Sequence, residues 1–253
     1  MRRTSFELVQ RDKDSLLAEL QLVAKYKDEI DVINFPDLFR LKFRPWDAAP
    51  IAKQFFKSAI PHIRAMDIDL TKELPMKSAF EENSLTEVLI IEGDPPQVAE
   101  HIVYPTQTTD VIRKFKDELP NVKIYCGLDQ YRSGMRDELY RIERKLQAGC
   151  SGFFTQPFYD LRFAEMYFDM LDGMLPHDEI YWGISPILSA SMLSYWERKN
   201  RVVFTQGFSE SFEWNVNLAK KTMDFAEKHD GSLYFMPISV DLKKYLEGIF
   251  GLR

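Results

Sequence analysis

Eight short strand-like segments recur along the chain, and helical patterns separate most of them. Such alternation is typical of parallel βα units, in which each helix returns the chain to the start of the next strand. Eight units predict a closed (β/α)8 barrel, or TIM barrel, with residues 1–253 forming a single domain. The strands are expected at Thr4 to Val9, Asp31 to Phe35, His62 to Met66, Glu87 to Glu92, Lys123 to Gly127, Gly152 to Thr155, Ile180 to Ile184 and Ser232 to Pro237.

The helical patterns between these strands carry apolar residues at helical spacing. A doubly wound open sheet is the structural alternative, but no GxGxxG turn follows the first strand. The helices are expected at Lys13 to Lys27, Thr109 to Glu118, Met135 to Ala148, Leu161 to Leu171, Ser191 to Lys199 and Phe212 to His229.

Charge and hydropathy exclude several classes of protein. A formal net charge of -6 and a pI near 5.4 argue against a surface that follows nucleic-acid phosphates. There is no run of eighteen apolar residues and no apolar signal core at the amino terminus, so we expect a cytoplasmic protein without a membrane partner. Cys126 and Cys150 form no CxxC pair, and the four histidines lack metal-ligand spacing, so no metal site is expected.

Glu7 is the most unusual residue of the expected strands. Strand alternation places Glu7 and Ser5 on the same face. Phe6 and Leu8 occupy the opposite face, and one of the two faces lines the barrel interior. A carboxylate enclosed there would have a raised pKa and could donate a proton near neutral pH. The alternative is a structural ion pair, for instance with Arg64.

Two further strand ends carry groups that suit a ligand, and TIM barrels place their catalytic residues at these ends. In "IIEGDPP", Gly93 permits close approach of a ligand, and Glu92 and Asp94 share strand parity, so both could face one site if a cation or a proton relieved their repulsion. An ordinary strand-to-turn signature is the alternative. In "SGFFTQPFYD", a buried strand ends in Thr155-Gln156 before a proline that we expect to stop the strand; the fold does not require that amide, whereas a ligand would use it.

The expected helix from Met135 to Ala148 carries clustered charges. Arg141, Arg144 and Lys145 have the spacing of a basic clamp for a pyrophosphate. The alternative is an ordinary solvated helix face.

Five segments in chain order, "SFELV", "PHIRAMD", "IIEGDPP", "RIERKLQAGCSGFFTQPFYD" and "LYFMPISVDL", resemble the methylenetetrahydrofolate reductase family over almost the whole chain. The most specific elements are Ser5-Phe6-Glu7 and the stretch from Ala148-Gly149 to Thr155-Gln156-Pro157-Phe158. The resemblance implies a (β/α)8 flavoprotein of one-carbon metabolism and methionine biosynthesis. Such an enzyme holds FAD, takes hydride from NADH or NADPH, and reduces 5,10-methylenetetrahydrofolate to 5-methyltetrahydrofolate.

The resemblance also implies roles for individual residues. Glu7 matches the acid that assists protonation of the folate N10, and Asp94 matches an aspartate near the pterin and the flavin. Gln156 and Phe158 fall in the stretch that contacts the bound folate or nicotinamide. The residues that the resemblance assigns to the FAD site are His62, Glu92, Gly93, Asp94, Tyr125, Glu138, Arg141, Arg144 and Lys145.

The sequence also departs from the pattern of this family. Glu92 stands where the pattern has the arginine of Arg-Gly-Asp, Glu138 replaces an aspartate, Arg141 replaces an asparagine, and Asp129 falls near an expected histidine. A flavin-free or partner-dependent folate-binding subunit of a reductase or methyl-transfer complex is therefore the alternative function, with a homo-oligomer or a redox subunit as partner. A barrel lyase or aldolase is a third hypothesis, for which no inward lysine is evident.

Overall fold

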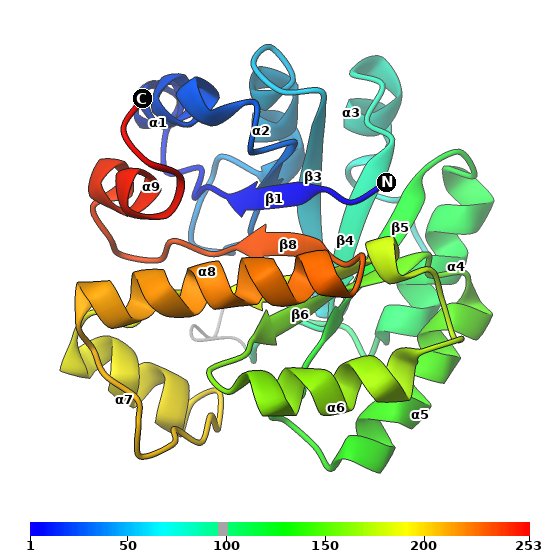
Figure 1. The fold of residues 1–253 in the computed structure, drawn as a ribbon. Coiled ribbons are helices and arrows are strands. Elements are labelled where there is room, and N and C mark those ends of the chain that lie inside the picture. Colours follow the sequence, from blue (N-terminus) through cyan, green and yellow to red (C-terminus); the bar gives the residue numbers. More distant parts are fainter. Residues whose placement is uncertain (96–100) are drawn as a thin grey trace.

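A closed barrel of eight parallel strands forms the centre of the protein, in a computed structural model that describes residues 1–95 and 101–253. Each strand pairs with the next, and β8 pairs with β1 to close the ring (Figure 1). The predicted (β/α)8 fold is confirmed. The strands are β1 (Thr4–Glu7), β2 (Val32–Phe35), β3 (Ser58–Arg64), β4 (Glu87–Ile91), β5 (Lys123–Leu128), β6 (Gly152–Pro157), β7 (Ile180–Ile184) and β8 (Ser232–Phe235).

Helices surround the barrel and cover the outer face of the strands (Figure 1). Short 3-10 segments occur at Ala24–Tyr26, Ala65–Asp67 and His177–Glu179. The α-helices are α1 (Lys13–Val23), α2 (Pro45–Ala52), α3 (Lys77–Glu82), α4 (Thr108–Glu118), α5 (Met135–Ala148), α6 (Leu161–Leu171), α7 (Ala190–Arg198), α8 (Phe212–Lys228) and α9 (Leu242–Phe250). None of the helices in the described ranges is both long and apolar enough to cross a membrane.

Strand β6 continues further than the sequence predicted. We expected a stop at Thr155, but the strand runs through Gln156 to Pro157. Proline lacks a backbone N–H and so cannot donate to the neighbouring strand. The sheet accommodates this because the pairing of β6 with β7 shifts register between Phe154 and Pro157.

The barrel interior is a packed core, separate from the core between strands and helices. Phe154 stacks on Tyr181 with ring centroids 4.0 Å apart, and Tyr125 meets Phe154 edge-on at 5.3 Å. The interior residues of this core are Val32, Ile60, Leu89, Tyr125, Phe154, Tyr181, Tyr234 and Met236. These large side chains fill the barrel interior, and TIM barrels carry their active sites at the carboxyl ends of the strands, so the functional site is sought there.

A buried ion pair closes the amino-terminal end of the barrel. Arg3 reaches Glu87 through two hydrogen bonds of 2.5 and 2.9 Å, and Ser58 and Tyr125 also donate to Glu87. Burial raises the pKa of Glu87, but Arg3 and these hydrogen bonds outweigh it and hold the pKa below its ordinary value. Glu87 is therefore a satisfied structural carboxylate.

Candidate active site at the carboxyl ends of the strands

Glu7 lies at the carboxyl end of β1 and points into the barrel, towards Tyr234 of the interior core, which shows which of the two alternating faces of β1 is the inner one. The hydroxyl of Tyr234 on β8 donates a hydrogen bond to its Oε2 atom. Burial raises the pKa of Glu7 to about 7, and the hydrogen bond from Tyr234 acts in the opposite direction. The side chain keeps partial contact with solvent. Glu7 is therefore a carboxyl group that can gain or lose a proton at neutral pH.

Arg64 does not pair with Glu7, which removes the ion-pair alternative. Its Nη2 atom donates to the carbonyl oxygen of Asp94 at 2.7 Å, and its Nε atom lies 3.4 Å from Asp67. The nearest polar partner that the structure gives Glu7 is a neutral hydroxyl, and no cation among residues 1–95 and 101–253 offsets the cost of ionising it.

A buried polar network lies beside Glu7 and Tyr234 in the barrel interior. The amide nitrogen of Asn34 donates to His62 Nε2 at 3.2 Å, and the hydroxyl of Ser5 donates to the amide oxygen of Asn34. Burial lowers the pKa of His62 to about 3, so this histidine is neutral. Because Nε2 accepts from Asn34, the proton of the neutral ring is on Nδ1. His62 is thus a neutral hydrogen-bonding group and not an imidazolium ion at physiological pH.

A second network follows strands β2 to β4; its acidic residues Asp37 and Asp67 stand at strand ends in the sequence, but their partners Arg44 and His101 were not predicted. Asp37 binds Arg44 at 2.5 Å, and burial, partly offset by Arg44, raises the pKa of Asp37 to about 6. Asp67 accepts from His101 at 2.7 Å, and the His101 ring stacks on the half-exposed ring of Phe39 at 3.5 Å. The loops after β2, β3 and β4 therefore line one side of the barrel at the carboxyl ends of its strands.

Glu92 and Asp94 do not face a common site. Ile91 belongs to the barrel interior, so Glu92 points outward, where its side chain is 60% exposed and binds Arg132 at 2.8 Å. Asp94 is 49% exposed and binds Lys199 at 2.7 Å. Each carboxylate has its own cation, so the repulsion that we expected between them is relieved separately. Gly93 has φ +95° and packs against Arg64, where a Cβ atom would come within 2.9 Å of Nε.

The structure places the two predicted substrate contacts at the end of β6, Gln156 and Phe158, in different environments. Gln156 lies where the pairing of β6 with β7 shifts register, its side chain is half-buried, and no hydrogen bond from the described part of the chain holds its side-chain amide. The amide is free to bind a ligand. Phe158 instead packs against Phe163 and Trp182 in the core outside the barrel and is 2% exposed. The structure therefore gives Phe158 a core position, away from the mouth.

The residues that the resemblance assigns to FAD do not come together. Tyr125 lies at the amino-terminal end, where it donates to Glu87 at 3.2 Å. Buried Glu138 accepts from the backbone of Asp129 at 3.1 Å, and Lys145 donates to the carbonyl oxygen of Gly127 at 2.7 Å.

Arg141 and Arg144 are exposed on α5, and Arg144 contacts Gln107 at 3.4 Å and the ring of Tyr140 at 5.9 Å. The three cations of the predicted clamp therefore do not converge within the described ranges. His62 is buried and already bonded to Asn34. These side chains do not fit FAD in the arrangement that the resemblance implies, and Pro96 of "IIEGDPP" lies outside the described residues.

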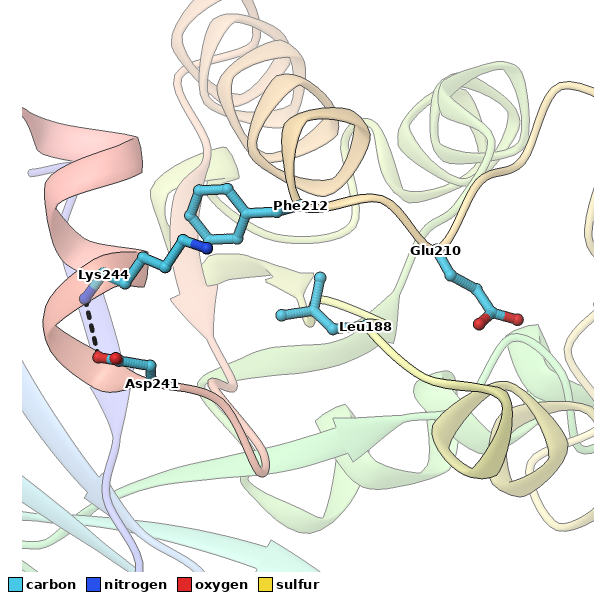
Figure 2. A pocket seen from close by; sticks show the side chains of 5 residues that line it. All are labelled: Leu188, Glu210, Phe212, Asp241 and Lys244. Atoms are coloured by element: carbon cyan, nitrogen blue, oxygen red, sulfur yellow. Dashed lines mark hydrogen bonds between the residues drawn. The ribbon is translucent and has the colours of Figure 1, made fainter.

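A shallow hollow of about 270 Å³ lies between the loops after β7 and β8 (Figure 2). TIM barrels often bind a phosphate here, at backbone N–H groups of a helix start. In this protein Asp241 accepts from the backbone N–H of Lys244 at 3.0 Å, so its own carboxylate caps α9. Glu210 adds a second negative charge, while Lys244 lies 4.5 Å from the ring of Phe212. This hollow does not favour a phosphorylated substrate.

The structure also bears on metal and Schiff-base chemistry. Within residues 1–95 and 101–253, no group of three or more His, Cys, Asp and Glu side chains is arranged to hold a metal ion. The eight strands contain one lysine, Lys123, which starts β5 and binds Glu179 at 2.5 Å. No strand therefore offers a Schiff-base lysine at the carboxyl end.

Comparisons with known proteins agree with the barrel fold. No protein-family model and no curated protein matches the sequence. Active domain 2 of a chitinase from Pyrococcus furiosus is 14% identical, with a TM-score of 0.57, and covers 95% of this chain and 86% of its own. The same domain in complex with chito-oligosaccharides is 15% identical, with a TM-score of 0.56 over 95% and 85%.

A 2,3-dimethylmalate lyase of the PEP mutase/isocitrate lyase superfamily is 10% identical, with a TM-score of 0.52 over 90% of this chain and 82% of that one. These proteins are enzymes, but likeness at such identities establishes the barrel fold alone.

Proposed function

We propose that this protein is an enzyme of one-carbon metabolism that binds 5,10-methylenetetrahydrofolate at the carboxyl ends of its strands and reduces it to 5-methyltetrahydrofolate. The observation that carries the proposal is Glu7, a carboxyl group at the carboxyl end of β1 that has no cationic partner in the described part of the chain and a pKa raised to about 7 by burial. This is the position where the resemblance to the reductase family requires an acid.

Glu7 performs the proton transfer in this proposal. It donates a proton to the folate N10, the bond between N10 and the bridging carbon breaks, and the electron pair of that bond remains on N10. The N5 lone pair stabilises the bridging carbon as an iminium ion, which accepts a hydride that originates from NADH or NADPH and so becomes the methyl group. A general acid works best when its pKa lies near the operating pH, and a pKa of about 7 meets that condition.

Gln156 and the polar interior network support binding. A free side-chain amide offers both a donor and an acceptor, so Gln156 can bind a pterin edge or a carboxamide without adding charge. The hydrogen-bonded side chains of His62 and Asn34 form a neutral polar surface beside Glu7. A neutral surrounding keeps the pKa of Glu7 high, because no fixed cation stabilises its ionised form.

The first experiment measures binding and turnover with purified protein. Binding of methylenetetrahydrofolate is followed by fluorescence, and reduction by NADH or NADPH is followed with and without added FAD. We expect Glu7→Gln to retain folate binding and to lose reduction by about 10²-fold or more, the usual contribution of a general acid. Glu197→Gln, on the exposed face of α7, is the matched control. Failure of the wild-type protein to bind the folate would refute the proposal.

The alternative is a flavin-free or partner-dependent folate-binding subunit. It is favoured by Glu92, which points outward to Arg132, and by the dispersal of the residues assigned to FAD. A visible spectrum recorded after incubation with FAD and desalting distinguishes a flavoprotein from a flavin-free or partner-dependent subunit. Retained flavin bands would support the flavoprotein that the resemblance implies. A colourless protein that binds folate but reduces it only with an added redox subunit would support the alternative.

A further inference from the structure

We propose that Tyr234 is a positioning residue, which holds one oxygen of the Glu7 carboxyl group and directs the transferable proton to the other oxygen. This inference rests on the proposed role of Glu7 as a proton donor. It assigns a task to a strand β8 residue that neither the sequence motifs nor the resemblance singled out.

The register of the barrel brings the two side chains together. Tyr234 pairs with Ser5 across the β1–β8 contact, and Glu7 lies two residues further towards the carboxyl end of β1. Two residues of a strand span roughly 6.5 Å, which a tyrosine side chain leaning along the barrel axis can cover. The hydroxyl of Tyr234 accordingly reaches Oε2 of Glu7.

Packing fixes the orientation of the Tyr234 ring. The ring is 5% exposed, meets Phe154 edge-on with centroids 5.0 Å apart, and faces His62 at 6.4 Å and 62°. A ring confined on these sides cannot swing its hydroxyl away from Glu7. Burial and the neighbouring Glu7 charge raise the pKa of Tyr234 well above its ordinary value, so its hydroxyl remains a donor at all physiological pH values.

A fixed donor distinguishes the two oxygens of Glu7. Oε2 accepts the tyrosine proton, so a proton bound to the carboxyl group resides on Oε1. No described residue forms a hydrogen bond with Oε1, and Glu7 keeps partial contact with solvent. Oε1 is therefore the atom placed to meet a substrate nitrogen.

The hydrogen bond also sets the pH range in which Glu7 works. It stabilises the carboxylate, so its loss raises the pKa of Glu7 further.

The test is Tyr234→Phe, which removes only the hydroxyl. The Glu7 carboxyl carbon is followed by NMR across a pH series with ¹³C-labelled glutamate, and its signal is assigned by its disappearance in Glu7→Gln. Tyr125→Phe is the matched control, because that hydroxyl binds Glu87 at the opposite end of the barrel.

We expect Tyr234→Phe to raise the pKa of Glu7 by about one unit, as loss of one hydrogen bond to a charged group implies. Tyr125→Phe should leave the Glu7 titration unchanged. In the enzyme assay, the pH at which kcat falls on the alkaline side should rise by the same amount in Tyr234→Phe, with KM little changed.

An unchanged Glu7 titration in folded Tyr234→Phe would overturn the inference. An unchanged kcat profile despite a shifted titration would also overturn it, because Tyr234 would then act on a carboxyl group outside the rate-determining step. If Tyr234→Phe does not fold, Tyr234→Met and Tyr234→Leu, which also lack a donor for Glu7, provide the same comparison. A wild-type protein that shows the Tyr234-dependent titration but binds no folate refutes the proposed function instead, so the two failures are distinguishable.

Discussion

Replacing Glu7 by Gln should make the protein more stable at alkaline pH. The folded state raises the pKa of Glu7 from its ordinary 4.5 to about 7, chiefly through burial. Between these two values the folded protein holds a proton on Glu7 that the unfolded chain has released. Stability falls with rising pH wherever the folded state binds more protons, so the contribution of Glu7 is present below pH 4.5 and is lost as pH rises through 7.

The size of this loss follows from the two pKa values. Each unit of difference between the folded and unfolded pKa corresponds to about 1.36 kcal/mol. A rise from 4.5 to about 7 therefore removes about 3 kcal/mol of unfolding free energy from the wild-type protein by pH 8, relative to pH 4. Gln has no charge to bury and keeps a hydrogen-bonding partner for Tyr234, so Glu7→Gln lacks this decline.

Urea unfolding at pH 5, 6, 7 and 8, followed by tryptophan fluorescence, measures the effect. The quantity of interest is the difference in unfolding free energy between Glu7→Gln and wild type, because other titrating groups cancel in it. We expect that difference to grow in favour of Glu7→Gln from pH 5 to pH 8. A constant difference would show that Glu7 titrates alike in both states, and the inference of an enclosed carboxyl group without a compensating cation would fail.

Three other substitutions test the packing and the ion pairs. Phe158→Ala should lower the unfolding free energy, measured by urea unfolding, by about 3–5 kcal/mol, as expected for a buried aromatic ring. A smaller loss would indicate that Phe158 lines an open substrate site instead. Glu87→Gln should cost about 3 kcal/mol in the same assay, because it leaves the partly buried Arg3 unpaired, and an unchanged midpoint would count against that ion pair. Lys199→Met should cost less than about 1 kcal/mol, because its pair with Asp94 is solvent-exposed, so a large loss would indicate a buried role.

The strands and the position of Glu7 were predictable because both depend on local pattern. Alternation along four or five residues places a side chain inside or outside a barrel regardless of what lies across from it. Local pattern also explains why a strand boundary was predicted wrongly. Proline at 157 predicts an early stop of β6, but a local register shift absorbs the missing donor. The helix Pro45–Ala52 was missed because it contains Pro50, and proline inside a helix is a strong signal against one.

Partners that come from distant strands were not predictable from the chain. The Tyr234 hydroxyl meets Glu7 across 227 residues of sequence, because β8 closes the ring against β1. Neither residue carries a local sign of the other. The charged residues of α5 were hard to predict for the same reason, since spacing along a helix does not show whether a cation bonds to a carbonyl oxygen of a neighbouring strand, as Lys145 does with Gly127, or remains exposed, as Arg144 does.

The two ends of the barrel use the same kind of side chain for opposite purposes. At the amino-terminal end, Glu87 is surrounded by Arg3 and two hydroxyl donors, which keep it ionised and contribute to stability. At the carboxyl end, Glu7 has a single neutral donor and a raised pKa, which destabilises its ionised form. Replacement of Glu7 by an amide would remove this cost, so the carboxyl group itself costs stability at this position, as is typical of residues whose chemistry is used. This contrast is the reason for placing the chemistry at Glu7.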